Sequence, residues 1–100
     1  WDTLQFLPLP LAQAVLDRIH RVLAPDALVL ALFHAESVGP AAVQQNCRIL
    51  DARHIQVAPR SAPRAITSFT PRSIEKFFRR FQALKFFFTR DNLQEIVARR

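Results

Sequence analysis

The chain has 100 residues, half of them hydrophobic, and a net charge of +6. This length allows one domain with a small core, so we treat residues 1–100 as a single unit. The longest uninterrupted apolar stretch, residues 27–33, is far shorter than the roughly 20 residues of a membrane-spanning helix. With no secretory leader in view, we expect a soluble, cytoplasmic protein.

Two further features of the composition constrain the chemistry. The single cysteine, Cys47, excludes an internal disulfide, and we expect its side chain to be buried as a small hydrophobic group. The sequence has no methionine, and we expect it to be part of a longer chain.

The positive charge is concentrated in residues 48–80. This stretch holds seven arginines and Lys76 against Asp51 and Glu75, which accounts for the whole net charge. A basic region can attract nucleic acid, a membrane surface or an acidic substrate. A solvated arginine-rich surface without a specific partner explains it equally well, and both interpretations stay open.

An amphipathic helix is predicted over about residues 10–23. Pro8 and Pro10 favour a helix start, because proline is tolerated in a first turn where the backbone amide has no partner. Pro25 blocks continuation of the helix. The apolar residues recur at steps of three and four and form one apolar stripe: Leu11, Val15, Ile19, Val22 and Leu23, with Ala12 and Leu16 beside them.

The next segment, residues 27–33, is apolar at every position. This pattern is typical of a strand that helices cover on both faces, whereas a half-exposed strand would alternate. A helix, a tight turn at Pro25-Asp26 and such a strand form the second half of a strand–helix–strand unit. We therefore expect a parallel strand before Trp1.

The middle of the chain has weaker signals. Gly39-Pro40 predicts a turn, and Val43 predicts the start of a short helical turn. Alternating apolar residues predict two short strands within residues 48–57, joined by a turn at residues 51–53. Prolines and small polar residues predict an exposed loop over residues 58–68.

The last third predicts a helix followed by a hairpin. Thr70 and Pro71 are suited to the N-cap and first position of a helix. A stripe of large apolar residues then marks its core-facing side: Ile74, Phe77, Phe78 and Phe81. Residues 84–89 and 93–99 predict two strands joined by a turn at residues 90–92.

Two segments, WDTLQFLP (residues 1–8) and LDRIHRVLAPDALVL (residues 16–30), resemble class I methyltransferases that use S-adenosylmethionine. In that family, a loop with an aspartate follows the fourth strand, and a helix ending in Arg-Val-Leu-x-Pro-Gly-Gly leads into the fifth. The closing hairpin is similar to the family's sixth and seventh strands, of which the last is antiparallel and inserted into the sheet. The resemblance covers residues 1–35 by sequence and 70–100 by order of elements, and leaves the middle as a variable insertion.

The resemblance implies an α/β fold with a partial Rossmann-like sheet: helix, parallel strand, insertion, helix and antiparallel hairpin. Residues 1–100 would then be the C-terminal portion of a methyltransferase domain that transfers a methyl group to an unidentified acceptor. The cofactor site also needs a glycine-rich turn and an acidic residue from the first two strands. Gly39 is the only glycine here, so we expect the fragment alone to be inactive.

Two positions depart from the family pattern. Asp26-Ala27 stands where the family has paired glycines, although aspartate tolerates the left-handed backbone that a tight turn requires. Phe6 stands where many members carry histidine, so the role of that histidine does not carry over.

The resemblance places the candidate site at the carboxyl edge of the sheet. It implies cofactor contacts from Trp1, Asp2 and Gln5, and acceptor contacts from Phe6 and His34, with His34 a candidate general base. The alternatives are that Trp1 and Phe6 form a hydrophobic plug in the loop, that Asp2 caps the loop, and that His34 has a structural role at the end of its strand. Three scattered histidines and one cysteine do not form a metal site.

A second interpretation is a small basic module that binds nucleic acid or an acidic partner through residues 48–80. It lacks a known recognition motif.

Overall fold

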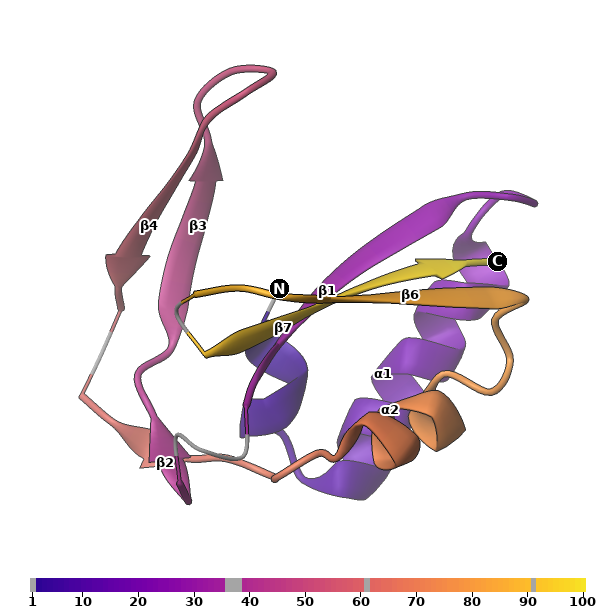
Figure 1. Cartoon of the computed structure of the whole chain (residues 1–100). Helices are drawn as coiled ribbons and strands as arrows, with labels where there is room; N and C mark the ends of the chain where they lie inside the picture. The colour runs from indigo at the N-terminus through magenta and orange to yellow at the C-terminus, as the bar shows by residue number, and fades with distance from the viewer. Residues whose placement is uncertain (1, 36–38, 61, 91) are drawn as a thin grey trace.

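The computed structural model describes residues 2–35, 39–60, 62–90 and 92–100. The chain begins with a 3₁₀ helix and an α-helix, and strands make up most of the regular structure after them (Figure 1). In chain order the elements are η1 (Asp2–Phe6), α1 (Leu9–Val22), β1 (Leu28–His34), β2 (Ala41–Ala42), β3 (Gln45–Ile49), β4 (Ile55–Pro59), β5 (Arg64–Ala65), α2 (Pro71–Phe77), β6 (Ala83–Phe88) and β7 (Leu93–Arg99). Neither α1 nor α2, the α-helices in the described residues, has the length and apolar character needed to cross a membrane.

The main sheet has three strands in the order β1-β7-β6. β7 is antiparallel to β1, with Leu28 opposite Arg99, and antiparallel to β6, with Ala83 opposite the same Arg99. β1 and β6 therefore run in the same direction on either side of the last strand. The smaller pairs β2-β5 and β3-β4 are also antiparallel.

The predicted α/β fold class is wrong. Every strand pairing in the described residues is antiparallel, and strands rather than helices make up most of the regular structure. The fully apolar pattern of residues 27–33 suggested a parallel strand, but composition does not encode the direction of a neighbour. Here the neighbour of β1 is β7, which follows β6 through a hairpin and runs antiparallel to β1.

β1 is not covered on both faces, which also corrects the sequence prediction. Ala31 and Phe33 are 2% and 0% exposed, whereas Leu28 and Leu30 on the other face are 65% and 45% exposed. Side chains alternate along a strand, so the two sets point to opposite sides of the sheet. The helices in the described part of the chain cover one side of the sheet only.

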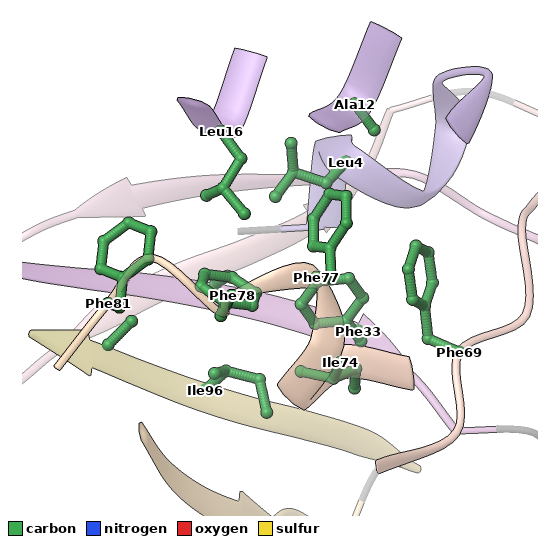
Figure 2. Packing of buried hydrophobic residues seen from close by; sticks show 12 residues of the cluster. Leu4, Ala12, Leu16, Phe33, Phe69, Ile74, Phe77, Phe78, Phe81 and Ile96 are labelled. Carbon is green, nitrogen blue, oxygen red and sulfur yellow. The ribbon is translucent and has the colours of Figure 1, made fainter. Parts of the chain in front are cut away.

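The hydrophobic core lies between that side and the two α-helices. Figure 2 shows Phe33, Phe77 and Phe78 at its centre, with Leu16 of α1 on one side and Ile96 of β7 on the other. The Phe33 ring meets those of Phe69 and Phe78 edge-on, at centroid distances of 5.1 and 6.2 Å. Edge-to-face aromatic pairs of this kind contribute about 0.5–1.5 kcal/mol beyond the burial of their area.

Both α-helices begin where the sequence predicts. α1 has proline in its first turn and ends before Pro25, after which Asp26 adopts the left-handed backbone conformation with φ of 62°. α2 is capped by the Thr70 hydroxyl, which accepts a hydrogen bond from the backbone amide of Ser73. α2 is shorter than its apolar stripe suggests, because regular helix ends at Phe77; Phe81 reaches the core from the turn after it.

Strands β3 and β4 form a hairpin that we call the arm, and it projects away from the sheet and the helices (Figure 1). Residues 46–60 are all exposed, and Gln45 pairs with Pro59 at the base. The arm confirms the two predicted strands. Two other predictions are wrong: Cys47 is exposed on the arm, and Val43 does not start a helical turn, because it lies between β2 and β3.

Candidate functional site

Buried polar side chains mark the carboxyl end of β1. Gln5 is 1% exposed, and its amide group bridges two segments that are far apart in sequence. The Gln5 Oε1 accepts from the His34 backbone amide at 2.5 Å, and Nε2 donates to the carbonyls of His34 and Thr67 at 3.4 and 3.1 Å. The Thr67 amide in turn donates to the Gln5 carbonyl at 2.9 Å. Gln5 therefore fastens η1 both to β1 and to the loop before α2.

The His34 ring lies in the same region, which we call the corner: it is formed by η1, the end of β1 and the loop at Thr67. His34 is 8% exposed at the end of β1, and the Phe6 ring meets the imidazole edge-on at a centroid distance of 6.2 Å. The structure therefore brings together Gln5, Phe6 and His34, three of the residues that the sequence assigned to the site. In this arrangement, Gln5 has a bridging role within the fold, while the aromatic pair forms a wall beside it.

The remaining predicted residues lie at the start of the chain. Trp1 lies outside the described residues, and Asp2 is the first residue of η1. The hydrogen bond from the His34 backbone amide to Gln5 holds η1 against the end of β1. The position of η1 relative to the sheet is therefore set by this contact.

Sequence reasoning missed two features of this corner. Gln94 is the cross-strand partner of Phe33, is 4% exposed, and has an Oε1 without a hydrogen-bond partner among the described residues. Thr67 supplies the backbone groups that receive Gln5. Neither residue belongs to a motif, although a lone Phe69 within a run of small polar residues does indicate a loop that returns to the core.

An apolar cavity of about 430 Å³ lies beside this corner, along β1 and between η1 and α1. Its walls are aliphatic and include Leu4, Leu7, Val15 and Ile19. A cavity of this size lined almost wholly by aliphatic groups offers little to orient a polar ligand.

The other titratable residues lie apart from the corner. His20 near the end of α1 packs edge-on against Phe81 at 5.0 Å. His54 at the tip of the arm contacts both carboxylate oxygens of Asp51 at 2.9 Å. The pKa of Asp51 is lowered, first by the hydrogen bond from the backbone amide of Arg53 and then by that from His54. No group of three or more metal-ligating side chains occurs within the described ranges.

The basic residues of the stretch 48–80 do not form one surface. Arg48 and Arg53 lie on the arm, whereas Lys76 and Arg79 lie on or just after α2. Arg80 is paired with Asp17 of α1 through its Nε at 3.1 Å. The concentration of charge along the sequence is therefore divided between the arm and the α2 region.

The comparisons with known proteins give no match. No protein-family model, no curated protein and no solved structure is significantly similar to this chain. The functional interpretation depends on the residues and on their arrangement.

Proposed function

We propose that this chain is the C-terminal part of a methyltransferase that uses S-adenosylmethionine, a soluble cytoplasmic enzyme whose acceptor is unidentified. The observation that carries the proposal is the position of the last strand, β7, between β1 and β6 and antiparallel to both. The resemblance of residues 1–8 and 16–30 to that family implies an inserted, antiparallel last strand. The proposal does not need parallel pairing within this chain.

The corner at the end of β1 supports the same proposal. Ligands of such enzymes gather where strands end, and the chain places Gln5, Phe6 and His34 there. Methyl transfer depends chiefly on aligning the acceptor with an activated methyl group, so it does not demand a catalytic acid–base pair. S-adenosylmethionine supplies that methyl group when bound, and the resemblance assigns Asp2 a polar contact to it.

Binding of S-adenosylhomocysteine, measured by calorimetry, tests this proposal. We expect the full-length product of the gene to bind and the 100-residue chain to show no binding, because it lacks the glycine-rich turn. Asp2→Ala in the full-length product should weaken binding roughly tenfold, as expected for one lost polar contact. Asp51→Ala, on the exposed arm, is the matched control and should leave affinity unchanged. A full-length product that does not bind would refute the proposal.

A second candidate function, binding of nucleic acid, is favoured by the arm. Its residues are exposed, and Arg48, Arg53 and Arg60 make no ion pairs among the described residues. Fluorescence anisotropy of a labelled oligonucleotide at about 50 and 200 mM salt tests it, because contacts to phosphates weaken steeply with salt. Replacement of all three arginines by glutamine should abolish such binding. Binding that survives this replacement would refute the role of the arm.

A further inference from the structure

A groove separates α1 from α2 on the helical side of the molecule. Its walls come from the first turn of α1, the loop before α2, and one side of α2, and it encloses about 500 Å³. Small-molecule sites in proteins occupy roughly 300–1,000 Å³. The groove therefore has the size of a site for one small ligand.

The base of the groove is aromatic and already ordered. Phe69 and Phe77 are 3% and 4% exposed, and their ring centroids lie 5.3 Å apart. Figure 2 shows the two rings beside each other. The two helices are linked at its side by Gln13, whose Nε2 donates to the Phe77 carbonyl at 3.3 Å. The Arg80–Asp17 ion pair makes a second link between the helix regions. A ligand would enter a formed site and would not need to open one.

Two cationic side chains line the rim of the groove. Lys76 and Arg79 line it, and within the described part of the chain neither forms an ion pair. Asp17 of α1 pairs with Arg80, and Glu75 of α2 is exposed but does not line the groove. The hydroxyl of Ser68, also at the rim, adds a neutral hydrogen-bonding group. An aromatic base beneath a cationic rim complements a molecule with an apolar body and one negative group.

We propose that this groove binds a small organic carboxylate whose aromatic or branched apolar group rests on Phe69 and Phe77 and whose charge faces Lys76 and Arg79. A cation would meet like charge at the rim, and a neutral compound would leave both side chains unpaired. The groove has room for one such molecule. This site does not depend on the proposed methyl transfer, and its ligand can be tested on the chain itself.

Titration of the ¹⁵N-labelled chain with 4-phenylbutyrate, followed by NMR, tests the site. We expect saturable shifts confined to the amides around the groove, including those of Ser68, Phe69 and Phe77. The neutral analogue 4-phenylbutan-1-ol should bind roughly 3- to 30-fold more weakly, since each exposed ion pair contributes a modest gain. Absence of saturable shifts at these residues, or equal affinity for the alcohol, would overturn the proposal.

Two variants assign the selectivity to the rim. Lys76→Ala combined with Arg79→Ala should remove the preference for the carboxylate and leave affinity for the alcohol unchanged. Arg72→Ala combined with Lys85→Ala also removes one arginine and one lysine, but from exposed positions outside the groove. This variant should retain the preference for the carboxylate. A preference that persists in the first variant, or an equal loss in the second, would contradict the assignment.

Discussion

Replacing Gln5 with leucine tests whether the corner at the end of β1 holds the fold together. The side chain makes three hydrogen bonds to backbone groups of His34 and Thr67 while only 1% exposed. Leucine has a similar volume but would leave those groups without their partner. A buried backbone group that loses its partner costs about 1–3 kcal/mol, and the 3.4 Å contact adds little. We therefore expect Gln5→Leu to lower the free energy of unfolding by about 2–4 kcal/mol.

Thermal and urea denaturation followed by circular dichroism would measure this loss. For a chain of this length, the expected drop in melting temperature is roughly 10–25 °C. Gln56→Leu on the exposed strand β4 is the matched control and should change stability by less than about 0.5 kcal/mol. If both variants unfold at the temperature of the parent chain, the bridging role assigned to Gln5 is wrong.

Four smaller predictions concern particular contacts. Thr70→Ala removes the cap of α2 and should cost about 1 kcal/mol in urea denaturation, with Thr70→Ser restoring it. Replacing residues 46–58 with an Asn-Gly turn should leave the melting temperature within a few degrees of the parent, because the arm is exposed and stands apart from the core. Gln94→Leu removes a buried oxygen that has no hydrogen-bond partner among the described residues, so it should raise the free energy of unfolding by about 1 kcal/mol; a loss would show that this oxygen is satisfied. The pKa of Asp51 is lower in the folded chain than in the unfolded chain, so its stabilisation of the arm is fully present above the unfolded pKa and is lost as pH falls through the folded pKa. The titration of the Asp51 carboxyl followed by NMR should have its midpoint below 3.8, and Asp51→Asn should abolish this pH dependence of the arm.

Local signals in the sequence located most of the elements. Prolines at positions 8, 10 and 25 delimit α1, and Thr70 with Pro71 starts α2, because these residues act on the backbone within one turn. The closing hairpin also lies where two strand-like segments and a polar turn predict it. These features need no information about distant neighbours.

The candidate site was only partly visible from the sequence. The resemblance identified Gln5, Phe6 and His34 as candidate site residues. It did not indicate that the Gln5 side chain would form hydrogen bonds with backbone groups of His34 and Thr67. A glutamine carries no sign of its partner when that partner is backbone 62 residues away. The α1–α2 groove was missed for the same reason, since its two helices are joined only in the folded chain.

The strand direction and the coverage of β1 could not be read from its composition. A uniformly apolar run shows that a strand is hydrophobic on both faces, but cover must come from neighbouring elements. The residues that the structure describes supply it to one face only. On the other face, Leu28, Leu30 and Phe87 remain 65%, 45% and 47% exposed. Leaving such side chains in water forgoes roughly 1.5–3 kcal/mol for each one that a partner could fully bury. Under the proposed function, the rest of the enzyme would supply that cover, so joining this chain to the remainder should raise its stability as well as create the cofactor site.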